Sequence, residues 1–434
     1  MDSIWQDTTG LPHFPSQNGD IKTDVLIIGG GLAGVLCAYW LDKAGVSYVL
    51  VEAERIAGGI TKNTTAKITS LHGLIYDKLI RLFGPEKARM YFMANEAALA
   101  KYRTLCAKIP CGFEEKDAFT YSLHDRGKIE REVRAAERLG LPASFCETLP
   151  LPFSVAGAIR FPDQAQFHPL QFIAGIAGEL HIYEHTRVRE LIGLTAVTNH
   201  GRIEAKSIIV TTHFPLLNKH GSYFMKLYQH RSYVLALENA QDVGGMYVDE
   251  RQKGLSFRNY GDLLLLGGGD HRTGKRGGGW AELRDFARRH YPEAKEKYRW
   301  AAQDCMTLDG VPYIGQYSRN TPGLYVATGF NKWGMTSAMA AAVLLSDLIA
   351  GKDDPYAALF SPSRSMLRPQ LAVNAAETAV SLITPTKKRC PHLGCALKWN
   401  EQERSWDCPC HGSRFTEDGK LIDNPATGDL KPGH

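Results

Sequence analysis

The sequence predicts an α/β protein of two or three domains that ends in a small β segment. Three observations support this class. Near the start, a strand, a glycine-rich turn, a helix and a second strand follow one another. Apolar strands and helical stretches then alternate as far as about residue 365. Finally, four of the nine cysteines and two histidines lie between residues 390 and 411. The 434 residues suffice for more than one hydrophobic core.

The first elements form a dinucleotide-binding pattern. Residues 24–28 are apolar and β-branched, residues 35–43 have helical composition, and residues 46–51 form a second apolar run that ends in Glu52. Between the first strand and the helix lies the run GGGLAG, which begins at Gly29. This order of strand, glycine turn, helix, strand and acid is typical of Rossmann-like domains.

Each residue of this pattern has a physical task. We expect Gly29 to form the tight turn, Gly31 to let the backbone approach a pyrophosphate, and Gly34 to let the helix pack on the strand. The free N–H groups at the start of the helix attract phosphate, and Glu52 accepts hydrogen bonds from ribose hydroxyls. These residues predict a bound dinucleotide.

The residues after Glu52 indicate which dinucleotide binds. The run RIAGGIT, which includes Gly59 and Thr61, resembles the FAD-binding oxidoreductases of the D-amino-acid oxidase-like superfamily. The resemblance implies that FAD is the cofactor and that Gly59 and Thr61 contact it. It also implies that the backbone of Val188 binds the adenine ring.

A second flavin contact is expected late in the domain. Residues 324–328 predict a strand, residues 329–336 a glycine-bearing loop, and residues 337–345 a helix of small residues. The N–H groups at the start of such a helix can stabilise a reduced, anionic flavin. The family resemblance favours this over an ordinary crossover, and the residues that it implies are Gly329, Trp333, Gly334 and Met335. We take Trp333 as a candidate catalytic residue.

The same resemblance implies a division of the chain into domains. A substrate domain of α+β type is expected as an insertion in the FAD-binding domain, with the flavin between the two. The FAD-dependent oxidoreductase covers residues 1–365. Its expected FAD-binding parts are residues 20–83, 150–229 and 301–365, and its expected substrate-binding parts are residues 84–149 and 230–300.

Lys67 is the second candidate catalytic residue. It lies in the run TTAKIT shortly after the glycine pair, a stretch that resembles bacterial FAD-dependent oxidoreductases with a C-terminal Rieske domain. It can pair with reduced flavin or tune its acidity, although a surface lysine at a helix start is an equal alternative. Four histidines are weaker candidates, because a lone histidine is more often structural: His72, His168, His213 and His271.

The Cys/His cluster near the end admits two metal sites. Its spacing is Cys390-x-His392 and then Cys408-x-x-His411, so each loop offers one cysteine and one histidine. A structural zinc site usually pairs cysteine with cysteine and histidine with histidine, whereas a Rieske [2Fe-2S] cluster has two thiolates on one iron and two imidazoles on the other. The mixed pairing favours the Rieske cluster.

The runs CPHLGC and CPCHGS also resemble Rieske proteins of the cytochrome bc type. This resemblance implies that Cys390, His392, Cys408 and His411 hold the cluster, and that Cys395 and Cys410 form a disulfide that links the two loops. It further implies that Ser413 donates a hydrogen bond to a cluster sulfur. Phe415 replaces the tyrosine of the respiratory proteins, so we expect a lower reduction potential here.

The Rieske segment is expected to be short. It covers residues 384–434, after a connector at residues 366–383 that is partly helical. A segment of this size buries little core, so we expect it to lean on the flavoprotein domain, the disulfide and the cluster.

The bulk properties exclude some functions. A net charge of +5 without a basic tail argues against nucleic acid, and the sequence shows no signal peptide and no apolar run long enough for a transmembrane helix. We therefore expect a cytoplasmic enzyme with a small-molecule substrate, an amine or amino acid, that reduces FAD. The cluster passes electrons singly to an external acceptor: a protein, a quinone or oxygen.

Two alternatives differ in class. In the first, the chain is an electron-transfer module whose FAD is reduced by NAD(P)H or a partner protein, although only one glycine-rich dinucleotide motif is present. In the second, it is a Rieske oxygenase, which needs a mononuclear iron held by two histidines and a carboxylate. No convincing set of such residues is found.

Overall fold

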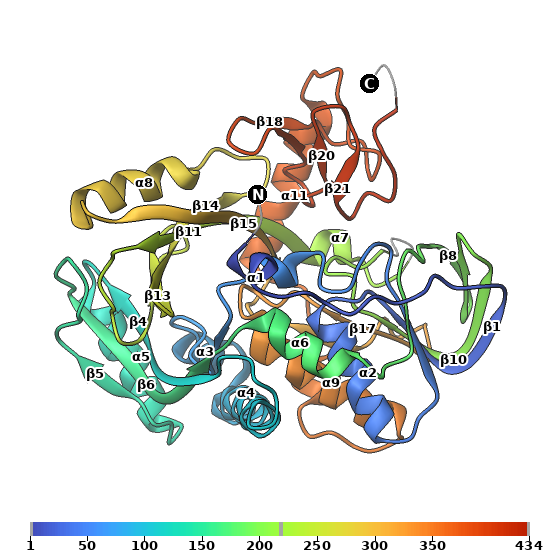
Figure 1. Cartoon of the computed structure of the whole chain (residues 1–434), viewed down its shortest axis with the longest axis horizontal. Helices are drawn as coiled ribbons and strands as arrows, with labels where there is room; N and C mark the ends of the chain where they lie inside the picture. Colours follow the sequence, from blue (N-terminus) through green and yellow to red (C-terminus); the bar gives the residue numbers. More distant parts are fainter. Residues whose placement is uncertain (1–2, 217–219, 432–434) are drawn as a thin grey trace.

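The computed structural model describes residues 3–216 and 220–431. Its strands form three sheets of eight, nine and four strands. Figure 1 shows the two larger sheets side by side, with the four-stranded C-terminal part above them. The protein is thus a mixed α/β molecule with a small β domain at its C-terminal end, which confirms the predicted fold class.

The first sheet is parallel at its centre. β1 lies between β10 and β2, and the four residues 25–28 of β1 are all buried because the sheet is covered on both faces. Antiparallel β9 and β8 extend from the first residues of β10, antiparallel β16 lies beyond β17, and β7 forms the other edge. The strands are β1 (Ile21–Ile28), β2 (Tyr48–Val51), β7 (Ile182–Tyr183), β8 (Val188–Ile192), β9 (Thr195–Thr198), β10 (Arg202–Val210), β16 (Tyr313–Gln316) and β17 (Leu324–Thr328).

The second sheet is mostly antiparallel. Its long strands β11 and β15 lie at one edge and run on toward the first sheet. The strands are β3 (Lys67–Ile68), β4 (Glu114–Ser122), β5 (Ser144–Cys146), β6 (Gly157–Gln166), β11 (Leu227–Glu238), β12 (Met246–Asp249), β13 (Ser256–Tyr260), β14 (Leu263–Arg272) and β15 (Lys295–Thr307).

Sheet membership differs from the expected boundaries at two strands. β3 and β6 belong to the second sheet, whereas residues 20–83 and 150–229 were assigned to the FAD-binding part. Alternation of apolar residues indicates a strand but does not select its partner, and β6 joins the second sheet by pairing with β4.

Helices cover both sheets. α2 packs against α9 and α6, and α8 packs on β14 and β11. The helices are α1 (Ile4–Asp7), α2 (Leu32–Lys43), α3 (Tyr76–Phe83), α4 (Pro85–Cys106), α5 (Arg126–Arg138), α6 (Pro169–Ala177), α7 (Tyr223–Lys226), α8 (Gly279–His290), α9 (Gly334–Ile349), α10 (Ala357–Phe360) and α11 (Pro369–Ile383), with a 3₁₀ turn η1 (Ile60–Asn63). Within the described part of the chain, no helix is both long and apolar enough to cross a membrane.

The C-terminal domain follows α11, the expected connector helix. Its sheet has the order β18 (Lys398–Asn400), β19 (Ser405–Asp407), β20 (Arg414–Thr416) and β21 (Leu421–Asp423). Its own core is small and contains four cysteines together with Phe415 and Leu397. As expected for so small a core, the domain leans on the rest of the chain: side chains of β11, β14 and β15 bond to its loops.

Candidate functional site

The glycine turn after β1 is built as its sequence predicts. Gly29 has a φ of 109°, and a Cβ there would lie 2.9 Å from the Thr211 carbonyl oxygen. A Cβ on Gly34 would lie 1.9 Å from the Gly29 carbonyl oxygen, so the helix packs as closely as glycine allows. At Gly31 the nearest atom to such a Cβ, Oγ1 of Thr61, is 3.5 Å away, so space remains beside the backbone.

Polar groups surround the start of α2. Thr61 Oγ1 accepts a hydrogen bond from the Leu32 N–H at 3.0 Å. The Glu52 carboxylate accepts from the N–H groups of Gly30 and Glu54, at 2.7 and 2.9 Å. Burial raises the pKa of Glu52, while these N–H groups lower it. An acid held at the end of β2 beside a helix N-terminus fits the ribose and pyrophosphate of a dinucleotide.

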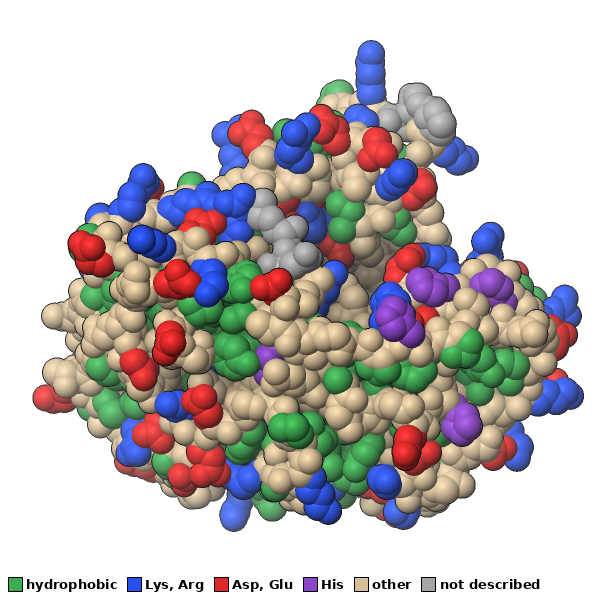
Figure 2. Space-filling model, viewed as in Figure 1, with side chains coloured by type: hydrophobic (Ala, Val, Ile, Leu, Met, Phe, Trp, Pro, Cys, Tyr) green, Lys and Arg blue, Asp and Glu red, His purple; other side chains and the backbone are tan. Residues whose placement is uncertain are grey.

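A cavity of about 1550 Å³ opens from this turn and continues between the two larger sheets. Figure 2 shows a recess on this face, below the C-terminal domain. Gly34 packs the helix and does not line the cavity. The cavity is lined by most of the residues that the sequence predicted for FAD: Gly29, Gly31, Glu52, Gly59, Thr61, Lys67, Val188, Gly329, Trp333, Gly334 and Met335.

Both candidate catalytic residues line the cavity, and they come from segments far apart in the sequence. Lys67 is 9% exposed, and its Nζ donates to Thr65 Oγ1 at 3.1 Å. Burial, together with the charge of Arg258, lowers the pKa of Lys67 to about 7. Trp333, at the start of α9, stacks on His72 with ring centroids 4.8 Å apart. His72 is itself fixed by Tyr91 and the Thr69 carbonyl oxygen, and burial lowers its pKa to about 3.

The other three histidines have different surroundings. His168 caps α6 and contacts Thr8, which is a structural role. His271 contacts Tyr233 and lies outside the cavity lining. His213 lines the cavity and faces Gln229.

A charged cluster on the substrate side was not predicted. Asp270, from β14, forms an ion pair with Lys332, whose Nζ also donates to Ser232 Oγ at 3.1 Å. Ser232 in turn donates to Asp304 at 2.9 Å. All four side chains line the cavity. A signal was present in the sequence, because Asp270 and Asp304 are acids in otherwise largely buried strands.

The expected cluster ligands converge in the C-terminal domain. The rings of His392 and His411 have centroids 5.0 Å apart. Burial lowers their pKa values, to about 4 and about 3, so both imidazoles are neutral as ligands must be. The Cys390 thiol interacts with Cys408, which lowers the pKa of Cys390 to about 7. Nδ1 of His411 is buried without a hydrogen-bond partner in the described chain, as expected for a metal-binding atom.

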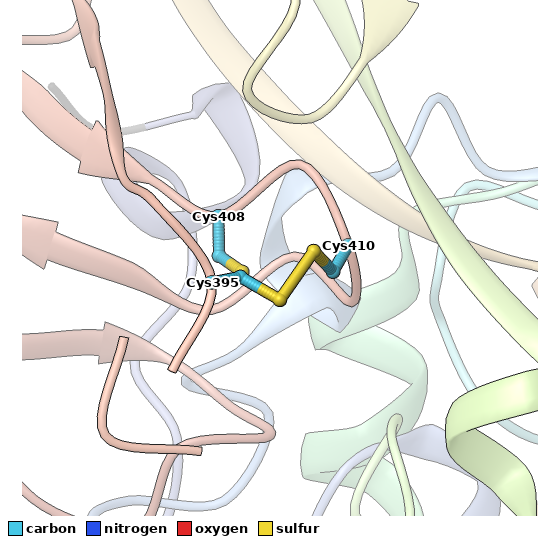
Figure 3. Close-up of side chains that lie close together, drawn as sticks. All are labelled: Cys395, Cys408 and Cys410. Carbon is cyan, nitrogen blue, oxygen red and sulfur yellow. A yellow bond between two sulfur atoms is a disulfide. The ribbon is translucent and has the colours of Figure 1, made fainter. Parts of the chain in front are cut away.

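A disulfide joins Cys395 to Cys410, as the resemblance implied. Figure 3 shows the Cys408 side chain beside this bond, and the three sulfur atoms lie within 4.8 Å of one another. Since the disulfide uses two of these sulfurs, the sulfur of Cys408 is the one of the three that remains free to bind a metal. Ser413 Oγ accepts from the Ala426 N–H at 2.9 Å, and Phe415 is fully buried. The donor set therefore fits a [2Fe-2S] cluster of Rieske type.

Comparison with known proteins agrees with this geometry. A family model described as FAD dependent oxidoreductase matches residues 24–348, and a Rieske [2Fe-2S] domain model matches residues 368–432. A putative Rieske 2Fe-2S iron-sulfur protein, YhfW, of Bacillus subtilis strain 168 is 35% identical, over 99% of this chain and 97% of that protein. Gamma-glutamylputrescine oxidoreductase of Escherichia coli K12 is 24% identical, over 84% of this chain and 93% of that protein.

Solved structures share the fold of the larger part. Glycine oxidase of Geobacillus kaustophilus has a TM-score of 0.66 at 19% identity, over 80% of this chain and 99% of that chain. Together with the two family models, this identifies both domains and their cofactors. The chain belongs to the family of FAD dependent oxidoreductases, carries a C-terminal Rieske domain, and uses FAD and a Rieske-type [2Fe-2S] cluster.

Proposed function

We propose that the enzyme oxidises a small amine or amino acid with FAD and passes the electrons through the cluster to an external acceptor. One observation carries this proposal: a single cavity is lined by three parts of the chain. They are the glycine turn of the first sheet, the charged cluster of Ser232, Asp270, Asp304 and Lys332, here called the polar wall, and residues 420–424 and 426–429 of the Rieske domain. In this proposal, substrate and flavin bind in a cavity that the Rieske domain also lines. The cytoplasmic location and the acceptor (a protein, a quinone or oxygen) belong to the same proposal.

The polar wall supports an amine as the substrate. Asp270 and Asp304 carry two negative charges and share one positive charge, that of Lys332. The group is therefore net negative and attracts a substrate ammonium more than a carboxylate. Because hydrogen bonds to charged groups contribute roughly 1.5–3 kcal/mol, loss of one of these acids raises the KM for an amine by about tenfold or more.

Lys67 supplies the proton acceptor. FAD bound in the cavity would supply a hydride acceptor for the carbon beside the substrate nitrogen. A cluster bound in the Rieske loops would supply single-electron transfer toward the acceptor. The substrate amine must also lose its extra proton. A lysine with a pKa of about 7 is neutral in a large fraction of molecules at neutral pH, so Lys67 Nζ can accept that proton.

The test is anaerobic bleaching of the flavin absorbance in the holoenzyme. A panel of amines and amino acids is compared with NADH and NADPH, and samples are frozen for electron paramagnetic resonance of the cluster. We expect an amine to bleach the flavin and a Rieske signal to follow. Bleaching by a pyridine nucleotide alone would refute the proposal and favour the electron-transfer module.

A matched pair of variants tests the charge of the wall. Asp304→Asn should raise the KM for the active amine. Glu54→Gln should leave it unchanged, because Glu54 also lines the cavity but its side chain is 71% exposed and pairs with Arg187. An equal effect of both substitutions would contradict the assignment of the substrate to the polar wall.

A further inference from the structure

A buried glutamine connects the FAD cavity with the cluster-binding loops. Gln229 lies on β11 and is 1% exposed. Its Nε2 donates to the carbonyl oxygen of His411 at 3.0 Å and to that of Asn424 at 3.4 Å. Its Oε1 lies 3.1 Å from Nε2 of His213, a residue of the cavity wall. Since the two carbonyls fix the amide orientation, His213 must carry its proton on Nε2 and donate it to Gln229.

The contact is reciprocal. Asn424, which directly follows β21 of the Rieske domain, donates from Nδ2 to the carbonyl oxygens of Thr212 and Phe214, at 2.6 and 2.9 Å. These two residues flank His213, whose φ of 65° places it in the left-handed region. Gln229 of the second sheet therefore binds the backbone of the Rieske domain, and Asn424 of the Rieske domain binds the backbone on both sides of His213. Together these bonds fix the position of the Rieske domain on the larger part of the protein.

Neighbouring contacts add to the same interface between the second sheet and the cluster-binding loops. Gln303 Nε2 donates to the Gly412 carbonyl oxygen at 2.9 Å, and Arg272 Nε donates to the Pro409 carbonyl oxygen at 3.0 Å. A Cβ on Gly412 would lie 2.7 Å from the Gln229 side chain, and one on Gly274 would lie 2.7 Å from the Pro409 nitrogen. A side chain larger than glycine at either position would therefore collide with the other side of the interface.

Aromatic rings cover the two cluster histidines on the same side. The Phe214 ring lies 6.2 Å from the His392 ring and 6.3 Å from the His411 ring, centroid to centroid. Phe224 lies 6.3 Å from His411. Gln229 itself is 1% exposed, and the exclusion of water strengthens its hydrogen bonds.

We propose that Gln229 is the positioning residue of the electron path: it ties His213 on the wall of the FAD cavity to the loop of the cluster ligand His411, so that the Rieske domain works in one docked position. This inference rests on the proposed function, in which electrons pass from flavin to cluster. Gln229 touches neither reacting group, and its role is to hold the distance between them.

The experiment compares Gln229→Leu with Gln17→Leu in the full holoenzyme. Gln17 is a suitable control because it is 3% exposed and also donates to a backbone carbonyl, that of Gly19, while its other side-chain partners are Arg202 and Thr198 and not residues of the Rieske domain. The flavin is reduced by light and EDTA without oxygen, and its reoxidation is followed together with cluster reduction. We expect Gln229→Leu to slow this transfer by about tenfold or more, because lost positioning reduces rates steeply. Gln17→Leu should transfer at the wild-type rate.

Two further readouts separate positioning from general damage. The paramagnetic signal of the dithionite-reduced cluster should be unchanged in Gln229→Leu, while amide hydrogen exchange in residues 408–412 should become faster. Gln229→Glu is a second variant, in which a carboxylate faces two carbonyl oxygens, and it should transfer at least as slowly as the leucine variant. Wild-type transfer rates in both variants would overturn the inference and leave the proposed function intact. Absence of transfer in the wild type would refute the proposed function, and the inference with it.

Discussion

The amino group of Lys67 lies on the wall of the FAD cavity beside Thr65. Its pKa is lowered to about 7, first by burial and second by the charge of Arg258. Between pH 7 and the ordinary lysine value of 10.5, the unfolded chain therefore holds a proton that the folded chain has released. Wherever the unfolded state binds more protons, stability rises with pH. Lys67 thus destabilises the empty fold most below pH 7.

This sign gives a prediction for Lys67→Met. In the FAD-free protein, the methionine variant should be more stable than wild type at pH 6, and the difference should shrink toward pH 10. Urea denaturation at a series of pH values measures the free energy of unfolding. Lys22→Met is the control, because the Lys22 side chain is 82% exposed and its removal should have no such pH dependence. A constant difference between the methionine variant and wild type would contradict the lowered pKa.

Single residues differ in how well the sequence revealed them. Gly31 and Glu52 stand at fixed spacings in a local pattern, and their environment is made by neighbours in the chain. Asp304 and Gln229 acquire their roles from partners far away in sequence, such as Ser232 and His411. No local spacing reports such contacts, so the polar wall and the docking contact appeared only in the structure.

At the scale of elements, the turn between β1 and α2 separates two kinds of glycine. A methyl group at Gly34 would collide with the Gly29 carbonyl oxygen at 1.9 Å, whereas one at Gly31 meets nothing closer than 3.5 Å. Gly34→Ala should therefore disrupt the packing of α2 on β1 and yield little folded protein.

Gly31→Ala should instead fold normally and lose FAD, because the methyl group fills the space that the pyrophosphate needs. Circular dichroism and thermal unfolding report the fold, and the flavin absorbance of the purified protein reports the cofactor. Full FAD content in Gly31→Ala would show that the pyrophosphate does not lie against this residue.

Elements were predicted more reliably than their partners. Most strands and helices that the sequence indicated are present, and α11 spans Pro369–Ile383 as expected. The sheet to which a strand belongs was not predictable for β3 and β6, because their pairing depends on distant segments. β3 pairs with β6, with Lys67 opposite Gln166, and β6 pairs with β4, with Gln166 opposite Glu114.

At the scale of the whole molecule, Glu403 joins the Rieske domain to the second sheet. It pairs with Arg231 of β11 and with Arg414 of β20, and all three side chains are at least nine-tenths buried. Burial raises the pKa of Glu403, but the two arginines lower it further, to about 2. A carboxylate with a depressed pKa stabilises the fold above its unfolded value of 4.5, and this contribution is lost as the pH falls toward 2.

Glu403→Gln should therefore lower the free energy of unfolding at pH 7 by an amount on the order of 3 kcal/mol, and the difference from wild type should diminish toward pH 2. Chemical denaturation followed by cluster absorbance measures the free energy of unfolding of wild type and variant at each pH. Glu417→Gln is the control on the same domain, because Glu417 is 61% exposed and surface pairs contribute about 1 kcal/mol or less. Equal losses of unfolding free energy in the two variants would contradict a stabilising role for the buried ion pairs of Glu403.

The docked Rieske domain also determines how the enzyme meets its acceptor. His411 faces inward and is 1% exposed, while Leu393, next to His392, is 41% exposed at the outer edge of the domain. The docking proposed above predicts a domain that does not shuttle between a donor and an acceptor. The acceptor must reach the outer edge by diffusion, so reoxidation of the enzyme should follow second-order kinetics, with a rate proportional to the acceptor concentration and limited by encounter.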